Sequence, residues 1–349
     1  MAVELPVQAR GVLPLFAWLT VGLLIISTLT LPTYFDLPYP APLGPKFDAA
    51  QKLQHIERLE ARQPDVVLIG DSQLYLGVDN ERLAADLDLE TYKIAVPGSG
   101  SAVWYLLIKN SVAESSHSPR VVVLTFRDTL LTLPDYRVNG RYFDLVDDYA
   151  RRSEPVLLER AYLAQLSPLE RAAGQYVPLY SARREIREGF DRELRYRLPG
   201  LVGCDEICAD TAIESVFGRE RLDPAALSAA VDAAQQSMFT PAALDFNGQV
   251  EQSFLPEIIR LAKEHGIQPV FVRMKTLIYP TLGTEPPAMR RYMASLRAYL
   301  EASGATLADF GHDERLGSTY FFDEMHFTDQ GAAVFTDLLA GELATIVGR

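Results

Sequence analysis

The sequence predicts an α/β protein in which a doubly wound sheet of about five parallel strands lies between two layers of helices. Short apolar segments alternate with amphipathic segments of helical length along most of the chain. The strand segments are apolar without interruption, which is typical of strands buried on both faces. The 349 residues are 48% hydrophobic and 23% charged, as in globular proteins.

The predicted elements follow one another in a regular order. We expect strands at residues 65–70, 91–96, 119–126, 267–274 and 305–311. We expect helices at residues 48–63, 78–87, 101–114, 250–266, 288–304 and 328–347. Asp48 is positioned to cap the first helix, and Pro64 ends it. Since the carboxyl ends of parallel strands meet at one edge, the loops there are expected to form the functional crevice.

Residues 131–246 interrupt this order within an α/β domain that spans residues 48–349. We predict a mostly helical insertion that emerges from a strand end and forms a lid, a substrate platform or a docking surface. Its segment 181–197 interleaves arginines with acidic residues. This pattern predicts a solvated helix with pairs such as Glu188–Arg192. Contact with lipid headgroups or an anionic polymer is the alternative.

Residues 1–35 are predicted to be a short cytoplasmic stub followed by a transmembrane anchor. Residues 11–31 carry no charge, and at about 1.5 Å per residue a helix of this length crosses a hydrocarbon core of about 30 Å. The alternatives are a buried core helix and a cleaved signal peptide, for which no convincing A-x-A site follows. The proline-rich residues 36–47 predict a stiff, extended linker.

The basic residues around this span predict its orientation. Arg10 precedes the span, and no basic residue follows it before Lys46. The positive-inside rule therefore predicts a single-pass protein whose main domain is extracytoplasmic, in the periplasm or at the cell surface.

The two cysteines agree with an oxidising compartment. Cys204 and Cys208 are the only cysteines, and their separation can satisfy disulfide geometry in a helical turn or a tight loop. Two unrelated thiols are the alternative, and a zinc site would need two further ligands nearby. The formal charge of −13 argues against nucleic acid as a partner.

Candidate catalytic residues follow the predicted strand ends. Ser72 ends the first strand segment, and a serine hydroxyl needs a base to act as a nucleophile. His326 precedes the last helix and is the best base, and Asp323 could hold its imidazole in one tautomer. The backbone N–H of Ser72 and one from the turn at 98–100 could donate to an oxyanion.

Each of these residues also has a purely structural interpretation. Ser72 could be a turn residue that ends a strand. Asp71, Asp323 and His326 could bind a metal, but no His/Cys cluster supports this, so we predict no metal and no cofactor. The other histidines lack a partnering pattern, which favours structural or surface roles for His55, His117, His265 and His312.

These motifs together resemble the SGNH/GDSL hydrolase family. Gly70-Asp71-Ser72 matches its first block, and the glycine of its second block corresponds to Gly98 or, as the less favoured choice, Gly100. Asp323-Glu324-Met325-His326 matches its last block. The resemblance covers residues 65–131 and 249–349 and implies an SGNH-like fold with a Ser72–His326–Asp323 triad and a glycine oxyanion donor.

One position departs from the family pattern. The third block usually supplies an asparagine that donates to the oxyanion, whereas this sequence has Arg127 there. An arginine could donate to the oxyanion or to an anionic acceptor. It could equally form a structural pair with Asp128.

The anchor, the exported domain and the insertion resemble the membrane-anchored branch of this family. The resemblance implies transfer of an acyl group, such as acetyl, from an acyl donor to hydroxyls of a cell-envelope polysaccharide or another acceptor, alongside a multi-span membrane acyltransferase. An esterase or lipase that hydrolyses acyl esters is one alternative. A non-catalytic scaffold of a membrane complex is the other.

Overall fold

A computed structural model describes residues 7–34, 36, 38–45, 47, 54–139, 142–164, 166–181 and 236–348. The chain divides into two compact units. The N-terminal unit comprises Met1–Lys46 and Leu163–Ala229, and the sheet unit comprises Phe47–Tyr162 and Ala230–Arg349. Cys204 and Cys208, predicted to form a disulfide, and residues 182–197 of the arginine-rich segment lie outside the described residues.

The sheet unit is built on five parallel strands, which confirms the predicted fold class. They are β1 (Val66–Gly70), β2 (Thr91–Ala95), β3 (Val121–Phe126), β4 (Gln268–Arg273) and β5 (Thr306–Asp309). Their order is β2-β1-β3-β4-β5. Every residue of β1 and β3 is buried, as the uninterrupted apolar runs predict.

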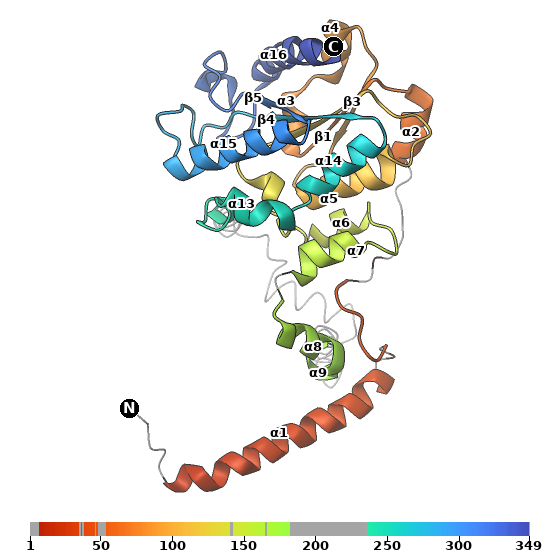
Figure 1. Cartoon of the computed structure of the whole chain (residues 1–349), viewed down its shortest axis with the longest axis vertical. Helices are drawn as coiled ribbons and strands as arrows, with labels where there is room; N and C mark the ends of the chain where they lie inside the picture. The colour runs from red at the N-terminus through yellow and green to blue at the C-terminus, as the bar shows by residue number, and fades with distance from the viewer. Residues whose placement is uncertain are drawn as a thin grey trace, which may run out of the picture. The chain divides into compact units, whose positions relative to one another are not determined.

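Helices cover both faces of the sheet (Figure 1). One face packs against α4 and α16, and the other packs against α5, α14 and α15. Alternate residues of β1 enter the two cores, Val66 and Leu68 on the α16 face and Val67 and Ile69 on the α5 face. The helices have these bounds: α4 (Asn80–Leu87), α5 (Ser101–Leu107), α14 (Leu255–Glu264), α15 (Pro287–Ala302) and α16 (Asp329–Val347).

Some element boundaries differ from the prediction. The helix predicted at 101–114 is α5 followed by a π-helical segment, Ile108–Val112. The helix predicted at 250–266 begins at Leu255, after a 3₁₀ turn at Val250–Gln252, because Pro256 occupies its first turn and the Ser253 hydroxyl accepts from the Leu255 N–H. In the helix predicted at 48–63, α2 is described over Gln54–Arg62.

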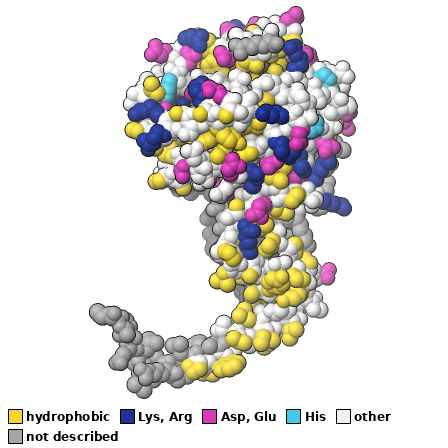
Figure 2. All heavy atoms as spheres, in the orientation of Figure 1, with side chains coloured by type: hydrophobic (Ala, Val, Ile, Leu, Met, Phe, Trp, Pro, Cys, Tyr) yellow, Lys and Arg dark blue, Asp and Glu magenta, His cyan; other side chains and the backbone are white. Residues whose placement is uncertain are grey.

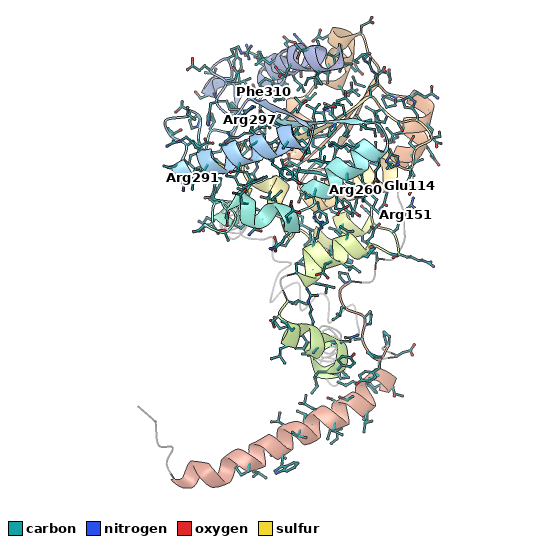
Figure 3. All side chains as sticks on the ribbon, in the orientation of Figure 1. Glu114, Arg151, Arg260, Arg291, Arg297 and Phe310 are labelled. Carbon is teal, nitrogen blue, oxygen red and sulfur yellow. The ribbon has the colours of Figure 1, made fainter. Side chains whose placement is uncertain are left out.

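The flanks of the predicted insertion belong to the sheet unit. The first flank carries α6 (Phe143–Asp147) and α7 (Pro155–Leu157), and α13 (Phe246–Gln249) begins where the second flank ends. Glu154, which is 1% exposed, accepts from Lys109 Nζ at 2.7 Å and from Asn110 Nδ2 at 2.8 Å. Arg151 also pairs with Glu114 at 3.0 Å (Figure 3). These contacts join the segment that carries Arg151 and Glu154 to the residues that follow α5.

The N-terminal unit contains α1 (Val7–Tyr34), α8 (Pro168–Tyr176) and α9 (Pro178–Ser181). A capping box of Ser167 and Glu170 begins α8. The described side chains of α1 are mostly apolar and exposed (Figure 2), with Trp18 at 74%. A surface of this kind suits contact with lipid.

Among the described residues, one helix has the length and apolar composition needed to cross a membrane, and it is α16. Of its apolar stretch, 44% is buried, as in a core helix that covers a sheet. The described apolar stretch of α1, Trp18–Tyr34, is shorter. Anchoring of the chain by residues 11–31 stays a prediction.

Candidate active site

Ser72 lies at the carboxyl end of β1, as the first residue of the short helix α3 (Ser72–Gly77). A turn that ends the strand is the structural alternative that the sequence offers for Ser72, and the structure has a short helix there. The Asp71 side chain caps it by accepting from the Gln73 N–H at 2.9 Å. Because β2 and β3 lie on opposite sides of β1, the crevice beyond β1 is at the switch point of the sheet, where ligands bind in such folds.

The structure brings Ser72, His326 and Asp323 together. Ser72 Oγ lies 2.8 Å from His326 Nε2, and His326 Nδ1 lies 2.8 Å from Asp323 Oδ2. If Nδ1 carries the proton and donates to the carboxylate, Nε2 is left to accept from the serine hydroxyl. This arrangement can activate a serine oxygen as a nucleophile.

Local hydrogen bonds hold the Asp323 carboxylate in place. The backbone N–H groups of Met325 and His326 both donate to Oδ1, each at 2.7 Å. Partial burial opposes ionisation of Asp323, but the hydrogen bonds from the His326 ring and from these two N–H groups hold its pKa below the ordinary value. Asp323 is therefore ionised at neutral pH and can stabilise an imidazolium.

Two contacts fix the loop that carries His326. Gln73 Nε2 donates to the Met325 carbonyl at 2.9 Å, and the Leu277 N–H donates to the Glu324 carbonyl at 2.7 Å. Gln73 is 2% exposed. Sequence reasoning misses it, because only its position directly after the candidate nucleophile marks it out.

An exposed aromatic ring lies against the candidate base. Phe322 stacks on the His326 ring with centroids 5.6 Å apart and an interplanar angle of 13°. Phe322 is 60% exposed, and Tyr75 in α3 is 58% exposed. Aromatic surface beside a nucleophile can pack against the apolar part of an acyl donor.

The two candidate glycine donors of the turn after β2, Gly98 and Gly100, differ in backbone conformation. Gly98 has a φ of +82°, which L side chains rarely adopt. Gly100 has an extended backbone, caps α5, and would place a Cβ 2.9 Å from the Tyr136 ring. Among described residues, no acceptor takes the N–H of Ser72, Gly98 or Gly100. Gly98 is the glycine whose backbone conformation the turn requires, and an oxyanion role for either glycine stays a prediction.

Arg127 forms a buried ion pair with the adjacent residue, Asp128. Its guanidinium is buried, and Nη1 donates to Asp128 Oδ2 at 3.0 Å and lies 3.4 Å from Met238 Sδ. The structure thus shows the pair with Asp128 that the sequence left as one of two alternatives. A role for Arg127 toward the oxyanion or an acceptor stays a prediction.

Asp71 is a buried carboxyl directly before the nucleophile. Desolvation raises its pKa above the ordinary value, and the charge of Arg127, the hydrogen bond from the Gln73 N–H, and the charges of His326 and Arg137 only partly offset this. Its ionised form is therefore costly to the folded state.

We expect Asp71→Asn to raise the free energy of unfolding at pH 7, because the amide oxygen can still cap α3 without a buried charge. A folded pKa above the unfolded value of 3.8 means that wild-type stability falls as pH rises from that value through the folded pKa. Urea unfolding of both proteins at several pH values should show that the difference between their free energies of unfolding becomes smaller as the pH is lowered. A difference independent of pH would contradict this.

The remaining histidines have structural partners. His55 Nδ1 lies 2.9 Å from the Tyr92 hydroxyl, and His265 Nδ1 lies 2.9 Å from the Leu261 carbonyl. His117 Nε2 lies 3.1 Å from the Pro64 carbonyl, and His312 lies 3.3 Å from Glu285. In the part of the chain that the structure describes, no three His, Cys, Asp or Glu side chains gather as a metal site.

Comparison with known proteins gives matches among solved structures alone. No family model and no curated protein matches the chain. A crystal structure of a proposed acylhydrolase from Bacteroides fragilis NCTC 9343 aligns with 12% identity and a TM-score of 0.41, covering 86% of this chain and 99% of that one. A GDSL-like lipase from Bacteroides thetaiotaomicron VPI-5482 aligns with 11% identity and a TM-score of 0.36, covering 85% and 98%.

Proposed function

We propose that this chain is a serine acyl-ester enzyme of the SGNH/GDSL type, with Ser72 as nucleophile, His326 as base and Asp323 as the residue that orients it. The observation that supports the proposal most directly is the pair of 2.8 Å contacts that joins the three side chains in a row. They lie at the switch point of a parallel sheet.

The reaction follows from these positions. Ser72 Oγ attacks the carbonyl carbon of an acyl donor while its proton passes to His326 Nε2. The negative charge on the carbonyl oxygen is stabilised by the backbone N–H groups of Ser72 and Gly98. The C–O bond to the leaving group then breaks, His326 returns the proton to that oxygen, and the acyl group remains on Ser72. An acceptor hydroxyl attacks this ester by the reverse steps, and Ser72 recovers its proton.

For the acceptor we propose a hydroxyl of a cell-envelope polysaccharide, with acetyl as the transferred group. The exposed apolar side chains of α1 support a chain held at a membrane. The position of Arg10 before this segment supports a sheet unit on the extracytoplasmic side. A multi-span membrane acyltransferase is the partner we propose to supply the acyl group. If water takes the place of the sugar hydroxyl, the same residues act as an esterase.

A non-catalytic scaffold is the second candidate. The observation that favours it is the engagement of Arg127 by Asp128, because this leaves the third strand end without the usual oxyanion donor. This candidate predicts that Ser72→Ala leaves cellular function unchanged.

Fluorophosphonate labelling of the full-length chain in detergent tests the enzyme proposal. We expect the wild type to be labelled at Ser72 and Ser72→Ala to be unlabelled, because a phosphonate reacts with an activated serine. Ser101→Ala is the matched control, since Ser101 is buried and donates to the Leu133 carbonyl. Equal labelling of wild type and Ser72→Ala would overturn the assignment of the nucleophile.

A further inference from the structure

Arg137 is a second arginine near the strand ends, and the candidate triad does not use it. It lies in the loop that follows β3, and its Nη1 would be 3.5 Å from a Cβ built on Gly98. The guanidinium therefore lies against the turn that we propose as an oxyanion donor.

Two aromatic rings hold this guanidinium. Arg137 Cζ lies 5.0 Å from the centroid of the Tyr136 ring and 5.0 Å from that of the Tyr142 ring. Cation–π packing occupies the flat faces of a guanidinium. Its N–H groups point outward in the plane, and this fork matches the oxygens of a carboxylate or a phosphate.

The charge of Arg137 has no acidic partner among the described residues. Arg127 pairs with Asp128 and Arg273 pairs with Glu285, whereas no carboxylate in the described ranges forms an ion pair with Arg137. Its Nε is buried and has no hydrogen-bond partner in the described part of the chain. The residue also has a φ of +53°, a conformation that is uncommon outside glycine and is found at ligand sites.

Arg137 is close enough to the triad to influence its surroundings. Its positive charge acts on the Asp71 carboxyl, as does the charge of His326. Arg137 and the triad histidine therefore both lie within electrostatic reach of the residue that precedes Ser72.

We propose that Arg137 forms an anion subsite of the acyl-transfer site and binds a carboxylate or phosphate substituent of the acceptor sugar. This inference rests on the proposed function, because it names the class of acceptor for that site. It predicts an acidic acceptor polysaccharide, whose anionic group is held at the Gly98 turn while a neighbouring hydroxyl reaches the acyl group on Ser72.

Titration calorimetry on the full-length Ser72→Ala chain in detergent tests the subsite without turnover. The probes are an oligosaccharide of glucuronate, glucose 6-phosphate, and a neutral glucose oligosaccharide. We expect at least one anionic probe to bind about tenfold more tightly than the neutral one, the ratio expected from a charge-assisted fork. The tighter of the two anionic probes identifies the substituent as carboxylate or phosphate.

Three further variants make the test specific. Arg137→Gln should remove the tighter binding of the anionic probe, and Arg137→Lys should keep part of it. Arg291→Gln should keep all of it and serves as the control, because it removes one exposed charge on α15 (Figure 3). Equal binding of neutral and anionic probes by the chain with Arg137 intact, or a preference that survives Arg137→Gln, would overturn the proposal.

An activity assay separates this role from a direct role in the reaction. With Ser72 intact, Arg137→Gln should slow acetyl transfer from p-nitrophenyl acetate to the glucuronate oligosaccharide more than transfer to the neutral glucose oligosaccharide, because only the anionic acceptor uses the subsite. An equal fall with both acceptors would place Arg137 at the oxyanion and overturn the subsite. The binding result does not depend on the nucleophile, so failure of phosphonate labelling and failure of the subsite are distinguishable.

Discussion

Replacing His326 by alanine is expected to lower kcat for hydrolysis of p-nitrophenyl acetate by about four orders of magnitude. His326 Nε2 is the group that lies 2.8 Å from Ser72 Oγ, and a serine hydroxyl without a base is a weak nucleophile at neutral pH. KM should change little, because the imidazole acts on the transition state rather than on substrate binding. Steady-state kinetics of the purified full-length variants measure both constants.

Two further proteins sharpen this prediction. The double variant Ser72→Ala/His326→Ala should be no slower than Ser72→Ala, because residues that act as one unit are not additive. His265→Ala is the control, since that ring contacts the Leu261 carbonyl within its own helix end. A His326→Ala protein that keeps a tenth of the wild-type kcat would show that this histidine is not the base.

Gly331→Ala is expected to lower the free energy of unfolding by about 3 kcal/mol and to reduce activity as well. Gly331 lies in the first turn of α16, and a Cβ there would be 2.2 Å from the Tyr320 carbonyl oxygen. That oxygen accepts from the Thr328 N–H at 2.8 Å, a bond that closes the segment carrying Asp323 and His326. Because the clashing atom is backbone, this segment has to move.

The same helix supplies a matched control. Gly341 also lies in α16, and a Cβ there would meet no atom of the described residues within 4 Å. Gly341→Ala should therefore raise the free energy of unfolding by about 0.5–1 kcal/mol, because alanine loses less conformational entropy in a helix. Urea unfolding gives both values. Equal changes in the free energy of unfolding from the two substitutions would show that a Cβ at Gly331 does not clash with the Tyr320 carbonyl oxygen.

The strands and most helices are predictable because their signal is local. β1 and β3 are buried on both faces, so each residue of these strands must be apolar or small, and the sequence shows this directly. The grouping of Ser72, Asp323 and His326 is predictable for a similar reason. Parallel strands bring their carboxyl ends to one edge, and all three residues follow such ends.

The rest of the site depends on contacts between distant segments. Gln73 acts through the Met325 carbonyl, and nothing beside Gln73 in the sequence indicates that contact. Arg127 follows a strand directly and therefore attracts attention, whereas Arg137 lies in a loop. Their difference lies in partners, because Asp128 forms an ion pair with Arg127, whereas two tyrosine rings pack on Arg137 and no described carboxylate forms an ion pair with it. A pattern of residue types does not encode that difference.

The helix α3 is hard to predict for a physical reason. Gly-Asp-Ser favours turns, and the turn and the helix share their first step, an aspartate side chain that accepts a backbone N–H two residues on. Burial of Leu74 then favours the helix over the turn, because its side chain packs fully buried in the core on the α16 face.

The Ser72–His326 contact joins residues that are 254 positions apart. Ser72 follows the first strand and His326 follows the last, so a polypeptide that has not yet been synthesised as far as His326 holds a serine without its base. The catalytic triad can therefore form only at the end of synthesis and folding, when the final helix packs on the sheet. In a refolding experiment, recovery of phosphonate reactivity would report completion of the whole sheet, and it would lag behind the recovery of helical content measured by circular dichroism.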